Sequence, residues 1–276
     1  MSRRSSRPKC GDCSGLRQVH GYDRLTLDAI ATTDESEGTL VPSIQYDCPA
    51  GPLPAYLAVP PGDGPWPGVV VIHDLRGMSA DLRRITDRFA ANGYLALAPA
   101  LYRRSIKPLC VVRTFKSLAQ GDGPTVDDLI AARNHLAADD RCTGKVGAVG
   151  FCLGGGFCLL LAPRGVFDAA APNYGIWPND AWPEDAESLR RSCPVVASYG
   201  AKDRMLPGAA AKLETLLIRS GAPHDVKEYP QAGHCFMNDF PKALKLVEGI
   251  TGLVYSEPEA EDAWRRILAF FGEHLA

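Results

Sequence analysis

The stretch KVGAVGFCLGGGFCLLLA, residues 145–162, carries a glycine-rich turn between two apolar segments. Its first part, Lys145–Phe151, is typical of a buried strand, and the apolar residues that follow the turn predict a helix. The turn itself, Gly150-Phe151-Cys152-Leu153-Gly154, has the form G-x-C-x-G. It matches the G-x-S-x-G elbow, in which a strand turns sharply into a helix, with a thiol in place of the hydroxyl.

The two glycines of this turn are explained by steric crowding. Side chains at Gly150 and Gly154 would collide with the neighbouring strand or helix, because the backbone reverses within a few residues. Cys152 then lies at a helix N-terminus, where backbone N–H groups and the helix dipole favour a thiolate. A small buried cysteine is the alternative interpretation. A phosphate-binding loop is less consistent with the stretch, which lacks the Lys-Ser/Thr pair of such loops.

Two further residues complete a candidate catalytic set. Asp203 follows one predicted strand in SYGAKDRMLP, and His234 follows the next in YPQAGHCFMND. The order nucleophile, acid, histidine is the chain order of the triad that uses this elbow. Both residues stand at the carboxyl ends of predicted strands, where the sites of parallel sheets form. The other histidines considered have no comparable context and are expected to be structural: His20, His135, His224 and His274.

The rest of the chain alternates between strands and helices, which predicts an α/β fold with a mostly parallel central sheet and helices on both faces. We expect an irregular, lid-like excursion over Arg103–Gly123 and a helix over Val126–Ala138 with Thr125 as N-cap. The predicted strands are 55–59, 68–73, 94–99, 145–151, 167–175, 193–200 and 224–230, and the other predicted helices are 79–92, 209–219 and 258–274. Residues 1–50 are expected to be a tail and leading segment, and residues 51–276 a single domain.

Composition excludes several classes of protein. The net charge of −2 gives no electrostatic reason to expect nucleic acid or an anionic membrane as a partner. No apolar run approaches the length needed to span a bilayer, and the polar N-terminus does not resemble a secretory signal. Nine cysteines, an odd number, favour reduced thiols in the cytoplasm. The single C-x-x-C pair, Cys10 and Cys13, lacks the further ligands of a zinc site. Catalysis by a thiol nucleophile with a histidine base needs neither a metal nor an organic cofactor, so we expect none.

The sequence resembles the dienelactone hydrolase family of the α/β-hydrolase superfamily. The segments that carry the resemblance are VVVIHDLRG, GYLALAPALY, KVGAVGFCLGGG, SYGAKDRMLP and AGHCFMND. The resemblance implies hydrolysis of a small carboxylic ester or lactone with Cys152 as nucleophile, His234 as base and Asp203 as the orienting acid. It also implies an oxyanion hole from the backbone N–H groups of Leu153 and Leu75.

The resemblance also points to residues around the nucleophile. Family members commonly have a glutamate after the first apolar strand that regulates the resting thiol, and Asp74 stands at that position here. Substrate contacts are expected from residues near the predicted site: Arg76, Tyr102, Arg103, Arg113 and Phe236. Arg104 is a further possible source of positive charge. The chain has no arginine directly after AGHCF, where the well-known family members use one for a substrate carboxylate.

Two other functions stay open from the sequence alone. The first is a thiol-based redox or sulfur-handling protein on the same fold, with Cys152 acting together with Cys235 or Cys158. The second is a catalytically silent binding protein. We expect Cys158 to face the core, because it lies six residues after Cys152 on the predicted helix. The oligomeric state and the natural substrate are not indicated by any motif.

Overall fold

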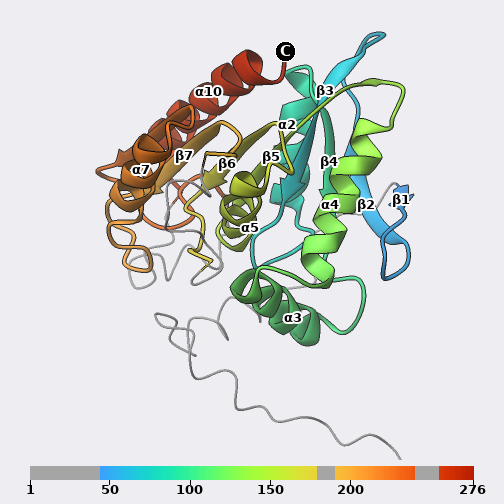
Figure 1. Ribbon diagram of the computed structural model, residues 1–276, viewed down its shortest axis with the longest axis horizontal. Helices are drawn as coiled ribbons and strands as arrows, with labels where there is room; N and C mark the ends of the chain where they lie inside the picture. Colours follow the sequence, from blue (N-terminus) through green and yellow to red (C-terminus); the bar gives the residue numbers. More distant parts are fainter. Residues whose placement is uncertain (1–43, 179–189, 240–254) are drawn as a thin grey trace, which may run out of the picture.

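The computed structural model describes residues 44–178, 190–239 and 255–276 (Figure 1). Within them, one eight-stranded sheet has the order β1-β2-β4-β3-β5-β6-β7-β8. The strands are β1 (Ile44–Tyr46), β2 (Leu53–Ala58), β3 (Trp66–Ile72), β4 (Leu95–Pro99), β5 (Cys142–Phe151), β6 (Ala169–Asn173), β7 (Val195–Gly200) and β8 (His224–Tyr229). Strand β2 is antiparallel to β1 and β4, and the pairs from β4 through β3 to β8 are parallel. The mostly parallel sheet was predicted.

The helices cover both faces of this sheet, as expected. They are α2 (Ala80–Ala91), α3 (Lys107–Gln120), α4 (Pro124–Ala137), α5 (Leu153–Leu161), α7 (Ala209–Ser220) and α10 (Glu257–His274), with a short 3₁₀ turn, η2 (Ala162–Arg164). Helices α4 and α5 both pack against β5, and α3 contacts both of them (Figure 1). Helices α2 and α10 contact each other through Phe89 and Trp264, whose ring centroids are 5.1 Å apart. With helices packed on it, the centre of the sheet is fully buried, which explains its continuous apolar strands.

The segment Arg103–Gly123, expected to be irregular, contains helix α3, so that prediction was wrong. Pro108 lies in the first turn, where a missing N–H costs nothing, and Gly121 ends the helix with φ 75°. One face is buried through Cys110, Thr114 and Leu118. Apolar side chains on the other face are exposed, namely Ile106, Leu109 and Val112. Because apolar residues occur on both faces of α3, the sequence lacks the helical spacing of apolar residues by which this helix could have been predicted.

Helix α4 begins differently from the prediction. It starts at Pro124 with Gly123 as N-cap, and Thr125 lies inside the helix. The Thr125 hydroxyl donates to Thr114 Oγ1 of α3 at 3.4 Å instead of capping its own helix. The capping preference of threonine is outweighed here by proline, whose fixed φ suits the first helical position.

The topology brings the predicted site residues to one edge of the sheet. Strands β3, β5, β7 and β8 run parallel, so the segments that follow them meet at the same end. These segments contain Asp74, Cys152, Asp203 and His234. Among the described helices, none combines the length and apolar character needed to cross a membrane.

Candidate active site

Cys152 occupies the sharp turn between β5 and α5 that the sequence predicted. Its backbone has φ 53° and ψ −112°, a region that non-glycine residues rarely adopt. The Cys152 N–H donates to the carbonyl of Asn173 at 3.1 Å, and its own carbonyl accepts from Gly156 and Ile176, each at 3.1 Å. These bonds to the segment after β6 and to the helix hold the strained turn in place.

The glycines on either side of Cys152 are required by close backbone contacts. A Cβ at Gly150 would lie 2.1 Å from the carbonyl oxygen of Gly154. A Cβ at Gly154 would lie 2.2 Å from the carbonyl oxygen of Ile72 at the end of β3. Both distances are far below van der Waals contact, so β5 and α5 can pack at this angle only with glycine at both positions.

His234 and Asp203 form a buried pair beyond the ends of β8 and β7. The Nδ1 atom of His234 lies 2.7 Å from Asp203 Oδ2, and both side chains are almost fully buried. The other carboxylate oxygen, Oδ1, accepts the backbone N–H of Met205 at 2.8 Å. Because an ionised carboxylate only accepts, Nδ1 carries the proton of this bond. The Nε2 atom of His234 is buried without a nitrogen or oxygen partner.

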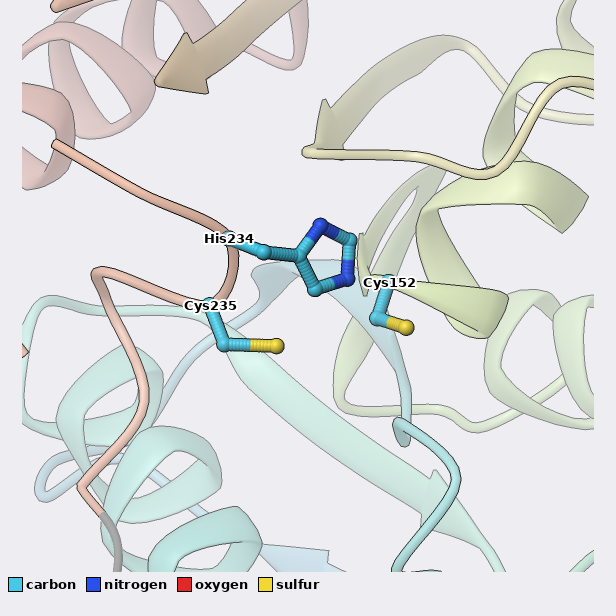
Figure 2. A group of neighbouring side chains, drawn as sticks. All are labelled: Cys152, His234 and Cys235. Carbon is cyan, nitrogen blue, oxygen red and sulfur yellow. The ribbon is translucent and has the colours of Figure 1, made fainter. Parts of the chain in front are cut away.

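The free side of the imidazole shares a small space with two thiols (Figure 2). The Sγ atoms of Cys152 and Cys235 and a ring nitrogen of His234 all lie within 4.8 Å of one another. Figure 2 shows the ring between the two cysteines, with both sulfur atoms directed toward the same side. All three residues are buried. The redox alternative named Cys235 or Cys158 as partner of Cys152, and the structure brings only Cys235 into this cluster.

The close packing of these groups changes their proton affinities. A hydrogen bond from the Cys235 thiol, opposed by burial and reinforced by His234, lowers the pKa of Cys152 to about 6. Burial alone would lower the pKa of His234, but the Cys152 thiolate and Asp203 outweigh it and raise that pKa to about 10. Burial and the neighbouring Cys152 raise the pKa of the Cys235 thiol well above its ordinary value. Near neutral pH the cluster therefore holds a thiolate, an imidazolium and a neutral thiol.

Asp74 forms an ion pair with Arg76 next to this cluster. Its Oδ1 accepts the backbone N–H of Arg76 and its Oδ2 accepts Nε, both at 2.8 Å. The Arg76 guanidinium also donates to Asp81 Oδ2 at 3.0 Å and to the carbonyl of Asp239 at 2.9 Å. Arg76, which was predicted from the sequence to contact the substrate, thus donates its hydrogen bonds to acceptors of the protein itself. The charge of Asp74 raises the pKa of Cys152, and it is the weakest of the influences on that thiol.

The other predicted contact residues lie in three different environments. Tyr102 is buried, and its hydroxyl has no hydrogen-bond partner among the described residues. Arg103 and Arg113 line a cavity of about 330 Å³ between β2, α3 and α4, whose lining contains none of Cys152, Asp203 and His234. Arg104 borders the same cavity and is paired with Asp128 at 2.6 Å. Phe236 is fully buried against the rings of Tyr174 and Tyr229.

Sequence reasoning missed two groups close to the site. His73 is fully buried directly after β3, with its ring centroid 4.6 Å from that of Tyr102 and its Nε2 without a partner. Its position at the end of a strand was the available signal. The second group is a chain of polar contacts in which Tyr174 donates to Asn238 at 2.5 Å and Asn238 donates to Asp81 at 2.8 Å. These residues are far apart in sequence, and no motif connects them.

Comparison with known proteins shows which family this arrangement belongs to. The family model described as the dienelactone hydrolase family matches residues 53–275. The chain belongs to the dienelactone hydrolase family. This membership confirms the resemblance seen in the sequence, the α/β-hydrolase fold and the prediction of a hydrolase for lactone or ester substrates.

Individual relatives agree with the family assignment. A "Putative carboxymethylenebutenolidase" of Yersinia pestis is 30% identical over 241 residues, which cover 80% of this chain and 84% of the relative. The crystal structure of a "Putative Dienelactone Hydrolase" from Klebsiella pneumoniae has 28% identity and a TM-score of 0.65, covering 83% of this chain and 98% of that one. A dienelactone hydrolase-like promiscuous phosphotriesterase from metagenomic libraries has 25% identity and a TM-score of 0.71, covering 84% and 97%.

Proposed function

We propose that this family member hydrolyses carboxylic esters or lactones through a Cys152–His234–Asp203 triad. The observation that carries the proposal is the position of the thiol. Cys152 lies in the strained elbow, within 4.8 Å of an imidazole whose far nitrogen is 2.7 Å from Asp203. A core cysteine would gain nothing from a carboxylate-oriented histidine or from a backbone conformation that costs on the order of 1–3 kcal/mol.

In the first step the Cys152 thiolate attacks the carbonyl carbon of the substrate. The oxyanion is held by the backbone N–H groups of Leu153 and Leu75. Leu153 is the first residue of α5, so its N–H has no acceptor within the helix. The imidazolium of His234 gives its proton to the leaving alkoxide, and a thioester remains on Cys152.

In the second step His234, now neutral, takes a proton from a water molecule that attacks the thioester. The Asp203 carboxylate keeps the ring in the tautomer with the proton on Nδ1 and stabilises the imidazolium that forms. The acid product then leaves, and the thiolate–imidazolium pair is restored. This sequence suits activated esters, enol esters and lactones. Amides are poorer substrates, because an amine leaving group competes badly with expulsion of the thiolate.

We choose the candidate substrate-binding residues by asking which polar side chains have no hydrogen-bond or ion-pair partner among the described residues. Tyr102 carries a buried hydroxyl that has no hydrogen-bond partner among the described residues, and burial, reinforced by the charges of Asp74 and Cys152, raises the pKa of this phenol. We propose that it donates to a substrate oxygen. Arg103 and Arg113 form no ion pair with a described residue and are proposed to attract an acidic substrate to this side of the molecule. Arg76 is not proposed as a substrate contact, because its guanidinium donates to Asp74, Asp81 and the carbonyl of Asp239.

Asp74 is proposed to set the reactivity of the resting thiol. Its carboxylate disfavours the thiolate of Cys152 by like charge. Both of its oxygens are bonded to Arg76, so this influence is strongest when the ion pair is loosened. A substrate that draws Arg76 away from Asp74, or that itself carries a charge, would therefore change the thiolate population at Cys152.

The cellular setting and extent of the domain are part of the same proposal. Seven cysteines of the described residues are free thiols, which supports a reducing compartment such as the cytoplasm. The family match over residues 53–275 supports a single domain over residues 51–276. Cys10 and Cys13 lie outside the described residues.

The test is turnover of p-nitrophenyl esters and of a panel of lactones, with and without a nearby carboxylate. Cys152→Ala is expected to abolish turnover and keep the fold, whereas Cys152→Ser retains at most weak activity. Cys142→Ser serves as control, because Cys142 lies at the other end of β5. Intact-protein mass spectrometry during turnover should show an acyl group on the wild type and none on Cys152→Ala. Wild-type rates from Cys152→Ala would overturn the assignment.

A thiol redox function is the second candidate, and the closeness of Cys152 to Cys235 favours it. A hydroperoxide would oxidise the two thiols to one disulfide and would itself be reduced to an alcohol and water. Titration of thiols with peroxide, compared with ester turnover in the same preparation, separates the two candidates. Rapid and complete loss of two thiols without any ester turnover would favour the redox function.

A further inference from the structure

We propose that Cys152, His234 and Cys235 together form a binding site for one soft divalent metal ion, with Zn²⁺ as the best-fitting ion. The hydrolase reaction uses Cys152 and His234 and leaves the thiol of Cys235 without a chemical step. A pair of thiols and an imidazole is a donor set that zinc prefers. The three side chains would supply three ligands, and a water molecule or substrate the fourth.

The distances between the three donor atoms suit this site. All lie within 4.8 Å of one another. Zn–S bonds of about 2.3 Å and a Zn–N bond of about 2.0 Å in a tetrahedron place neighbouring ligand atoms about 3.5–3.8 Å apart. The donors therefore need to close by about 1.3 Å at most, which rotation of the two short thiol side chains can provide. Figure 2 shows both sulfur atoms directed to the same side of the ring.

The second shell of the proposed site is already formed. A metal-binding imidazole typically donates its other N–H to a carboxylate, which fixes the tautomer and orients the ring. His234 Nδ1 makes this contact with Asp203 at 2.7 Å. The remaining nitrogen, Nε2, is buried without a nitrogen or oxygen partner, and only 2% of His234 is exposed. Once it has lost its proton, this buried nitrogen, which lies within 4.8 Å of both thiols, can serve as a metal ligand.

The backbone at Cys235 gives an independent reason to look for a role of its side chain. Its φ is 61°, in the left-handed region that favours glycine. Glycine would adopt this turn without strain, yet the chain has a cysteine here. Its thiol is buried beside Cys152, where simple packing of a small apolar group would not need sulfur. A second thiol raises the proposed site from two protein ligands to three.

Binding requires both thiols in their thiolate form and a neutral imidazole, so two protons leave with each ion, one from His234 and one from Cys235. The two negative charges then balance the charge of the ion, which is favourable in a buried site. An ion held there occupies the nucleophile and the base together. The loss of activity on metal binding rests on the proposed function, whereas the binding itself does not.

The experiment uses the full chain with Cys10→Ser and Cys13→Ser, because these two cysteines are possible metal ligands outside the described residues. Co²⁺ is titrated as the spectroscopic probe, and Zn²⁺ is titrated in competition with a chromophoric chelator. We expect one ion per chain and a near-ultraviolet thiolate-to-Co²⁺ absorption band. Zn²⁺ should also stop ester turnover in proportion to occupancy, and EDTA should restore it.

Variants assign the ligands. Cys235→Ala is expected to weaken Zn²⁺ binding by at least about tenfold, since loss of a mere second-shell partner already costs about 10–100-fold. Cys235→Gly, which suits the left-handed backbone, gives the same result if alanine disturbs the fold. Cys142→Ser at the far end of β5 is the control, with unchanged affinity.

Two results of the binding measurements would overturn the site: absence of the Co²⁺ band, or Zn²⁺ affinity that is the same in Cys235→Ala, Cys235→Gly and their parent. Ligand-dependent Zn²⁺ binding in a protein that turns over no ester would keep the metal site and reject the proposed function. Ester turnover unaffected by stoichiometric Zn²⁺ would keep the function and reject the site.

Discussion

Replacing His234 with alanine is expected to raise the pH at which Cys152 becomes reactive from about 6 toward the value of about 8.5 of a free cysteine. In the native protein the Cys235 thiol and His234 together overcome burial and stabilise the thiolate. Without the imidazolium, the carboxylate of Asp203 also loses its partner, and burial of Cys152 works against ionisation. The hydrogen bond from the Cys235 thiol, which is the largest cause of the low pKa, remains in the variant, so the value of about 8.5 of a free cysteine marks the upper end of the expected shift.

A full shift of about 2.5 pH units would correspond to about 3 kcal/mol in favour of the native thiolate, which His234 shares with Cys235. At pH 7 the thiolate fraction then falls by at most about 30-fold in the variant. The thiolate that remains is up to about tenfold more nucleophilic, because nucleophilicity rises with basicity. The net rate at pH 7 therefore drops by at most about threefold, and the midpoint of the pH profile is the quantity that decides.

The assay is alkylation by iodoacetamide, a neutral reagent, in the presence of EDTA and across pH 4.5–10. The rate is followed on the Cys152 peptide by mass spectrometry, in the wild type, His234→Ala and the control Cys142→Ser. The reasoning is refuted by a wild-type midpoint of 8.5 or higher, or by identical midpoints in the wild type and His234→Ala. The control should keep the wild-type midpoint.

Three further outcomes are expected. Asp203→Asn should lower the catalytic rate by up to about 10⁴-fold yet leave more activity than His234→Ala, as steady-state kinetics will show; equal losses contradict an orienting role. Gly154→Ala places a Cβ 2.2 Å from the Ile72 carbonyl oxygen and should lower the free energy of unfolding, measured in urea, by about 1–3 kcal/mol or more. Gly272→Ala is the control and should not lower it, because the nearest atom to its Cβ is 4.0 Å away. Asp74→Asn should lower the alkylation midpoint of Cys152 further, because the amide no longer opposes the thiolate; an unchanged midpoint with unchanged turnover assigns Asp74 a structural role.

The sequence predicted the central strands well because their burial leaves a local mark. The expected strands 68–73 and 145–151 correspond to β3 (Trp66–Ile72) and β5 (Cys142–Phe151), whose buried parts are the apolar runs 68–72 and 146–151. The elbow was equally visible, since the close contacts at Gly150 and Gly154 allow no other residue. The three-residue edge strand β1 was missed, because so short a strand has too few residues for a pattern.

The details that were missed depend on contacts between distant segments. Thr125 has a good N-cap side chain, but its hydroxyl bonds to another helix. The link from Asp81 to Asn238 joins residues 157 positions apart, which no local pattern can reveal. The sequence gives no sign of the positive φ of Cys235, because cysteine rarely adopts this backbone conformation and glycine would be expected there.

The double role of Asp81 has a consequence for protein engineering. Its carboxylate, on the first turn of α2, accepts both Arg76 from the loop after β3 and Asn238 from the turn that carries His234. The helix thereby ties together two loops that belong to opposite sides of the reaction centre. Variants with altered substrate range should consequently appear on α2 as well as among the residues that meet the substrate, and a library restricted to the pocket lining would not sample them.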